Sequence, residues 1–327
     1  MTTGLPFDDF RSLLANLGPV DGNAAETARE NFRQTGGDRG SPTTIEGVAA
    51  WLAGSSGRAH PSVNRPVLAV FAGNHGIAGE GVSPRPPSAT ADEVELCASG
   101  GAAINRLCAA GDLGLKVLDL ALDLPTGDIS HEAAFDERTA AATMAFGMEV
   151  IAGGVDLLGI GDFGVANSTV AAAIAAALFG GKGADWAGAG SGADKTMIMH
   201  KAAVIDRALA CHTGHFRDPL EVLRRLGGRE FAAIAGAVLA ARMERIPVIL
   251  DGYAAMAAAA VLHAANPDAL DHCRLAAVPV EPPQAKLASL LGLAPVLAFD
   301  AGGSGGAGAA IAMMAVRNVA LCRRGGN

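Results

Sequence analysis

The sequence predicts an α/β protein built around a doubly wound parallel sheet. Short apolar runs of strand length recur along the 327-residue chain, and segments with the apolar spacing of helices lie between them. Several runs end in glycine-rich turns, which are followed by alanine-rich stretches that begin with good helix-capping residues. Regular alternation of strand and helix indicates parallel strands joined by helical crossovers.

Six apolar runs are expected to form the strands. The first follows Arg65-Pro66, and the third is bounded by glycines, as is typical of a buried strand. Prolines after Glu281 are expected to stop the fifth run. The expected strands are residues 67–72, 116–120, 155–160, 247–252, 275–281 and 296–300.

The helices are expected before and between these strands. Thr43 or Thr44 caps one of them, with Glu46 in its first turn. Ser88 or Thr90 starts a longer one. The expected helices are residues 6–17, 24–32, 44–53, 88–110, 140–152, 170–178, 197–211, 220–226, 230–243, 254–265, 284–291 and 308–323.

Composition excludes several classes of protein. Half of the residues are apolar, enough for one large α/β domain and a smaller part. No apolar stretch reaches the roughly 18 residues of a membrane span, and residues 1–14 lack a signal-peptide pattern, so we expect a cytoplasmic protein without a membrane partner. The formal charge of −8 argues against nucleic acid. Five scattered cysteines without metal spacing are expected to be reduced structural thiols.

The turn after the third expected strand is the main candidate for a ligand site. Gly161 and Gly164 have no side chains, which lets a phosphate approach the backbone. Asn167, Ser168 and Thr169 are good N-cap residues for the following helix, whose first amides and dipole favour an anion. The turn therefore predicts a phosphate site.

Two other interpretations of this turn remain open. Gly159-x-Gly161-x-x-Gly164 also matches the dinucleotide-binding fingerprint, with Asp185 about 20 residues further on. Asp185 lies beside Trp186 in a glycine-rich segment and does not end an apolar strand, so a nicotinamide dinucleotide is less favoured than a phosphate-bearing substrate. An ordinary structural turn is the second alternative.

A second glycine-rich turn extends the predicted site. It contains Gly190, Ser191 and Gly192 and precedes a helix with Lys201, the natural cation for a bound phosphate. Exposed lysines on helices usually have no specific role, which is the alternative for Lys201.

Histidines form two further patterns. His75 lies in a glycine turn after the first strand, at the sheet edge where ligands gather, and is either a general acid or base or a hydrogen-bonded structural residue. His212-x-x-His215 lacks a third ligand at metal spacing and is interpreted as the end of a helix. Residues 80–87 are expected to form an ordered pocket loop.

Motifs spread over nearly the whole chain resemble those of the nicotinate-nucleotide:dimethylbenzimidazole phosphoribosyltransferases. They are Phe71-Ala72-Gly73-Asn74-His75-Gly76, Gly164-Val165-Ala166-Asn167-Ser168-Thr169, Gly188-Ala189-Gly190-Ser191-Gly192, Leu226-Gly227-Gly228-Arg229-Glu230, Pro247-Val248-Ile249-Leu250-Asp251-Gly252-Tyr253 and Glu281-Pro282. The resemblance implies a homodimer with a Rossmann-like large domain at residues 60–300. It also implies a small helical domain formed by residues 1–59 and 301–327.

The resemblance also implies a reaction in cobalamin lower-ligand synthesis. In that family a benzimidazole nitrogen attacks C1′ of the ribose of nicotinate mononucleotide, nicotinate leaves, the anomeric configuration inverts, and neither a metal nor another cofactor is required. The implied partners are a small nucleotide and an aromatic base. Phosphate and ribose are expected at Gly161, Gly164, Asn167, Ser168, Thr169, Gly190, Ser191, Gly192 and Lys201. The base is expected at Ser83, Asp92, Gly303, Ser304 and Gly305.

The sequence departs from the family pattern where the base should bind. The family's last glycine loop, Arg-Leu-Gly-Glu-Gly-Thr-Gly, has a general-base Glu that aligns with Gly305. Asp162, one methylene shorter than the family's Glu in the phosphate turn, is the candidate catalytic residue that replaces this base, and Asp92 or an ordered water is the alternative. These departures predict either a transferase with a rebuilt catalytic site or a catalytically silent relative that binds a nucleotide or a partner enzyme.

Overall fold

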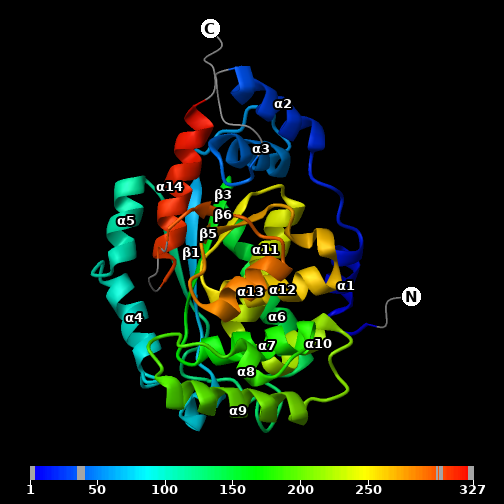
Figure 1. The fold of residues 1–327 in the computed structure, drawn as a ribbon, viewed down its shortest axis with the longest axis vertical. Coiled ribbons are helices and arrows are strands. Elements are labelled where there is room, and N and C mark those ends of the chain that lie inside the picture. Colours follow the sequence, from blue (N-terminus) through cyan, green and yellow to red (C-terminus); the bar gives the residue numbers. More distant parts are fainter. Residues whose placement is uncertain (1–3, 35–40, 300, 302–304, 323–327) are drawn as a thin grey trace.

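Six parallel strands form a single sheet in the order β2-β1-β3-β4-β5-β6 (Figure 1). The structure is a computed structural model that describes residues 4–34, 41–299, 301 and 305–322. The strand order reverses at β1, which confirms the predicted doubly wound α/β fold. The strands are β1 (Pro66–Ala72), β2 (Gly114–Asp119), β3 (Leu157–Phe163), β4 (Val248–Leu250), β5 (Cys273–Ala277) and β6 (Pro295–Leu297).

The helices confirm most of the expected segments and correct one. The prediction of a single helix over 88–110 is wrong, because the chain turns at Gly100, where φ is 77°, and two helices form. Within the described ranges, no helix is long and apolar enough to cross a bilayer. The helices are α1 (Asp8–Ala15), α2 (Gly22–Gln34), α3 (Ile45–Ser56), α4 (Ala89–Ala98), α5 (Ala103–Gly111), α6 (Glu137–Met148), α7 (Asn167–Phe179), α8 (Gly183–Trp186), α9 (Lys195–Cys211), α10 (Pro219–Leu226), α11 (Arg229–Met243), α12 (Tyr253–Ala265), α13 (Pro282–Leu290) and α14 (Ala307–Leu321), with 3-10 turns η1 (Gly76–Glu80), η2 (Glu149–Ile151) and η3 (Pro267–Leu270).

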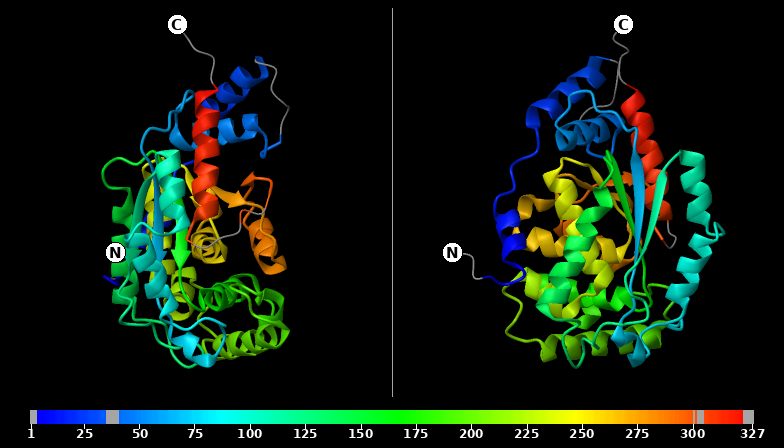
Figure 2. Two further views of the ribbon diagram at one scale, coloured as in Figure 1. Left: turned by 90° about the vertical axis from the view of Figure 1, so that its left-hand side faces the viewer. Right: turned by 180° about the vertical axis from the view of Figure 1, so that it is seen from behind.

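Helices cover both faces of the sheet (Figure 2). Successive side chains of a strand point to opposite faces, and β1 follows this rule. Leu68 and Val70 belong to a core shared with α3, α5 and α14. Ala69 and Phe71 belong to a larger core shared with α6, α7, α11 and α12. Both faces of β1 are therefore buried, which explains its continuous apolar sequence.

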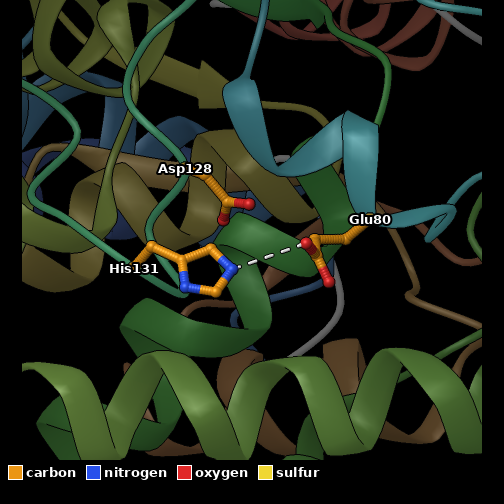
Figure 3. Close-up of side chains that lie close together, drawn as sticks. All are labelled: Glu80, Asp128 and His131. Carbon is orange, nitrogen blue, oxygen red and sulfur yellow. Dashed lines mark ion pairs between the residues drawn. The ribbon is translucent and has the colours of Figure 1, made fainter.

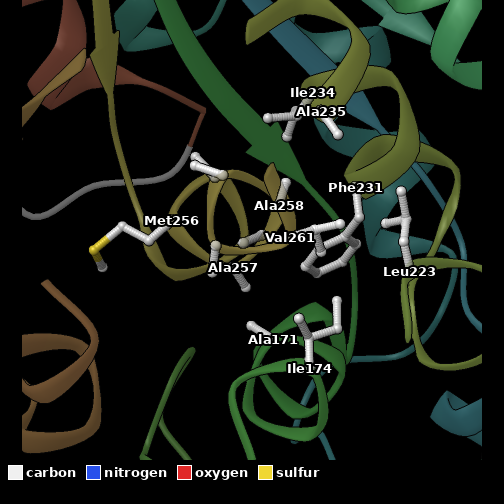
Figure 4. Close-up of a cluster of buried hydrophobic side chains, with 14 of the residues drawn as sticks. Ala171, Ile174, Leu223, Phe231, Ile234, Ala235, Met256, Ala257, Ala258 and Val261 are labelled. Atoms are coloured by element: carbon white, nitrogen blue, oxygen red, sulfur yellow. The ribbon is translucent and has the colours of Figure 1, made fainter. Parts of the chain in front are cut away.

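Small residues bring the helices of the larger core into close contact. A Cβ on Gly147 of α6 would collide with the backbone carbonyl of Ala233 on α11, and one on Gly236 would collide with that of Met144. The two helices therefore pack backbone to backbone. Larger side chains fill the core among α7, α10, α11 and α12 (Figure 4). These fillers include Ile174, Leu223, Phe231 and Val261.

Helices α2 and α3 meet the C-terminal helix α14 at the amino edge of the sheet. Helix α2 packs on α3, and α3 packs on α14 (Figure 1). Helix α14 also lies against β3 and β5, so its first half covers the sheet. The division into a large domain at 60–300 and a small domain from the chain ends stays a prediction.

Candidate active site

A cavity of about 390 Å³ lies at the carboxyl ends of β3, β4 and β5. Ligands of parallel α/β sheets bind at this edge. The cavity brings together nine of the predicted site residues: Ser83, Asp162, Gly164, Asn167, Ser168, Gly190, Ser191, Lys201 and Gly305. Among the described residues, four predicted ones do not line it: Asp92, Gly161, Thr169 and Gly192. Gly303 and Ser304 lie outside the described residues.

Asp162, near the end of β3, is one of the acids that line this cavity. Its Oδ1 accepts a hydrogen bond from Asn167 Nδ2 at 2.7 Å. Burial raises the pKa of Asp162 to about 8; the charges of Glu230 and Asp251 also raise it, while the Asn167 bond lowers it. A carboxyl group with this pKa is mostly protonated at pH 7 and exchanges its proton near neutrality.

The helix after this turn does not begin as predicted. Ala166, not Asn167, takes the N-cap position of α7, and it does so with a left-handed φ of 70°. That conformation is unusual for a residue with a side chain and is typical of functional turns. No side chain caps the helix, because Ala166 has no side-chain acceptor, and the Asn167 amide donates to Asp162. The capping prediction for Asn167, Ser168 and Thr169 is therefore wrong.

The glycines of the turn are required by the packing of the chain itself. A Cβ on Gly161 would lie 2.6 Å from the Cα of Gly306, just before α14. A Cβ on Gly164 would lie 2.9 Å from Glu230 Oε1. Gly161 thus makes room for the C-terminal helix, and Gly164 separates a buried glutamate from the cavity.

Lys201 is a buried cation at the amino end of α7. Its side chain extends from α9, and Nζ donates hydrogen bonds to Ser168 Oγ at 3.0 Å and to the Gly188 carbonyl oxygen at 2.8 Å. The residue is 1% exposed, so it is not the exposed surface lysine of the alternative interpretation. Burial lowers the pKa of Lys201 to about 8, against the opposing charge of Glu281. An anion in the cavity would favour the charged form of Lys201.

Two acids that the sequence analysis did not assign to the site bind backbone amides of segments beside the cavity. Glu281 Oε1 accepts a hydrogen bond from the Gly190 amide at 3.1 Å and so orders the second glycine-rich turn. Asp251 Oδ2 accepts one from the Ala309 amide at 2.9 Å, in the first turn of α14. Asp251 follows β4 and Glu281 follows β5. This position at the carboxyl edge of the sheet is the sequence signal that could have assigned both acids to the site.

The predicted base pocket is modified in two places. Gly305 lines the cavity with φ of 72°, and a Cβ there would lie 2.5 Å from Cζ of Phe163. Asp92 is exposed on α4, whereas Glu93 lines the cavity and forms an ion pair with Arg85 at 2.7 Å. The acid that α4 directs into the cavity is therefore Glu93.

A group of potential metal ligands lies away from the cavity (Figure 3). Carboxylate oxygens of Glu80 and Asp128 and a ring nitrogen of His131 lie within 4.8 Å of one another. Glu80 is already paired with Arg207 and lies 3.6 Å from His131 Nε2, as in a surface ion-pair network.

His212 lies at the end of α9, as predicted, and its Nε2 donates a hydrogen bond to the backbone carbonyl oxygen of Ile129 at 3.0 Å.

Comparison with known proteins points to one family. A family model described as phosphoribosyltransferase (DBI_PRT) matches residues 17–324. A nicotinate-nucleotide–dimethylbenzimidazole phosphoribosyltransferase from Brucella anthropi is 55% identical over 323 residues, which cover 99% of this chain and 95% of the relative. A protein of the same name from Rhizobium leguminosarum is 54% identical with the same coverage. The crystal structure of CobT from Thermus thermophilus has a TM-score of 0.81 at 32% identity and covers 91% of this chain and 95% of its own.

Proposed function

This chain belongs to the phosphoribosyltransferase family, and on that premise we propose that it transfers the phosphoribosyl group of nicotinate mononucleotide to a base of the dimethylbenzimidazole type. The observation that carries the proposal is that Asp162 and Lys201 line the same cavity. One exchanges a proton near neutral pH, and the other is a buried cation. The relatives at 54–55% identity are named as enzymes, which favours a transferase over a silent relative.

The phosphate of the nucleotide binds between α7 and Lys201. The first amides of α7 and the helix dipole attract an anion, and Nζ of Lys201 lies beside Ser168 in the same first turn. Gly190 and Ser191 form the facing wall, which Glu281 orders. The ribose then extends from the phosphate site toward Asp162, since Lys201 and Asp162 line the same cavity.

Asp162 accepts the proton that the transfer releases. A benzimidazole nitrogen forms a bond to C1′ while the bond to the nicotinate ring breaks, and the electron pair of that bond stays on the ring nitrogen. The new ribosyl-base product then loses the proton of its other nitrogen. Before the transfer, the positive charge of the bound pyridinium ring lowers the pKa of Asp162 below its value of about 8, so the carboxylate form is available.

The test is release of nicotinate from nicotinate mononucleotide in the presence of dimethylbenzimidazole, followed by chromatography. The wild-type protein is expected to release nicotinate, and Asp162→Asn is expected to be slower by about 10²–10⁴. Asp112→Asn, at a side chain that is 89% exposed and distant from the cavity, is the control and should match wild type. A protein that neither binds the nucleotide by calorimetry nor releases nicotinate would contradict the proposal.

We further propose that the enzyme is a cytoplasmic homodimer, as the resemblance implies. Light scattering after size exclusion should give about twice the chain mass of 32.7 kDa. A single-chain mass at micromolar concentration would exclude the dimer.

A further inference from the structure

His75 and Glu230 form a buried pair behind the wall of the cavity. His75 follows β1, and Glu230 lies in the first turn of α11. The distance from Nε2 to Oε1 is 2.5 Å, and the two side chains are 1% and 0% exposed. Neither residue lines the cavity. Among the described residues, His75 Nδ1 and Glu230 Oε2 have no hydrogen-bond partner.

Three glycines from three loops make room for this pair. A Cβ on Gly73 would collide with Glu230 Oε2, and one on Gly228 would collide with the ring of His75. A Cβ on Gly164 would lie 2.9 Å from Glu230 Oε1. The loops after β1 and β3 and the loop before α11 are thus all shaped to the pair. A buried carboxylate with one unpaired oxygen reduces stability, so a shape built to keep it indicates a functional constraint.

The His75–Glu230 pair is connected to Asp162 through Gly164 and Asn167. The point that a Cβ on Gly164 would occupy is 2.9 Å from Glu230 Oε1 and 3.2 Å from Asn167 Nδ2. The same Nδ2 donates to Asp162 Oδ1 at 2.7 Å. Glu230 and Asn167 thus both lie against Gly164, and Asn167 is bonded to Asp162.

We propose that Glu230, held in place by His75, is a positioning residue of the transfer site that acts through Asp162. Its negative charge keeps the Asp162 carboxyl group protonated until the cationic ring of the nucleotide arrives. This inference rests on the proposed function, since it gives Glu230 its role in that reaction.

The surrounding charges support this role. After burial, the charge of Glu230 raises the pKa of Asp162 most. Asp251, just after β4, and, more weakly, Glu93 of α4 act in the same direction. Glu230 itself is faced by His75 and by the neighbouring guanidinium of Arg229. Removing the Glu230 charge should therefore lower the pKa of Asp162.

The test is a ¹³C NMR titration of the aspartate carboxyl carbons, with the Asp162 signal assigned by its loss in Asp162→Asn. In Glu230→Gln, which keeps the shape of the side chain, the titration midpoint of Asp162 is expected to fall by about one pH unit. The matched control is Glu46→Gln, because Glu46 is also buried in the first turn of a helix, α3, and forms an ion pair with Arg33 of α2. Its Asp162 midpoint should equal that of wild type.

Two results would overturn the inference. One is a folded Glu230→Gln protein whose Asp162 midpoint is unchanged. The other is a result for the wild-type protein alone, namely a titration midpoint of Asp162 near the ordinary aspartate pKa of about 4. Glu230→Asp, which keeps the charge, is expected to stay closer to the wild-type midpoint than Glu230→Gln does, and the reverse order would also contradict the role of charge.

Two different measurements distinguish failure of the proposed function from failure of the role proposed for Glu230. Nicotinate release reports on that function, whereas the NMR midpoint requires no turnover. In an active enzyme, the acid limb of kcat/KM against pH should move to lower pH in Glu230→Gln, in the same direction as the NMR midpoint. An active variant whose acid limb does not move would contradict action through Asp162.

Discussion

The carboxylate of Asp251 accepts a hydrogen bond from the backbone amide of Ala309 at 2.9 Å. Asp251 follows β4, and Ala309 lies in the first turn of α14, so this bond joins the carboxyl edge of the sheet to the C-terminal helix. A negative charge is favourable at a helix amino terminus. Gly308 permits the approach, since a Cβ there would lie 2.9 Å from both carboxylate oxygens. The cavity wall at Gly305 therefore depends on Asp251.

Asp251→Ala is expected to lower the free energy of unfolding by about 1–2 kcal/mol, because it leaves amides at the start of α14 without their acceptor. Urea unfolding at pH 7 measures the change. Asp112→Asn, at an exposed side chain, should stay within about 0.5 kcal/mol of wild type. Equal stability of the two variants would show that α14 does not need this bond.

Asp162→Asn is expected to raise the melting temperature at pH 7–8. The pKa of Asp162 is about 8 in the folded protein and about 4 in the unfolded chain, so between these values the unfolded chain ionises while the folded protein stays protonated. Stability from this group is complete below pH 4 and is lost as pH rises toward 8. The variant should therefore gain about 2–5 °C at pH 8 relative to wild type and little at pH 4. A gain independent of pH would contradict this account.

Lys201→Met is expected to weaken binding of nicotinate mononucleotide at least about tenfold, because it removes the buried cation beside Ser168, where we propose that the phosphate binds. Calorimetry at pH 7 measures it. Lys195→Met, at an exposed lysine on the same helix α9, is the matched control and should bind as wild type does.

Nucleotide binding should also depend on pH through Lys201. The pKa of Lys201 is about 8, and only its charged form attracts an anion. Asp162 ionises over the same pH range and opposes this effect, so the test uses an Asp162→Asn background. There, the affinity should fall about tenfold between pH 7 and pH 9. The double variant with Lys201→Met should show no such fall, and an equal fall in both proteins would assign it to another group.

Gly305→Glu tests whether the cavity lacks only the family's general base. If so, the new carboxylate raises nicotinate release. Gly305 has φ of 72° and lies against Phe163, so any side chain there costs about 1–2 kcal/mol in backbone strain. Gly305→Ala has the same strain without the acid and is therefore the reference for both rate and melting temperature. Equal rates in the two variants would show that the substrate pocket differs in more than the base.

The sequence by itself determined the sheet. The run at 67–72 and the run that became β3 are apolar in nearly every position, because strands buried on both faces need apolar side chains on both. The turn between β3 and α7 and the importance of Asp162 were also predictable, since ligands bind at the carboxyl edge of such a sheet. Local spacing was sufficient for these features.

Only the tertiary structure decided which side chains reach the cavity. Asp92 and Glu93 are neighbours in the sequence, but about 100° of helix rotation separates them, and only the packing of α4 directs Glu93 inward. The burial of Lys201 depends on Ser168 and Gly188, and the need for glycine at 161 depends on Gly306. These contacts join residues far apart in the chain, so no local pattern contains them, and they form only when separate elements close around one core.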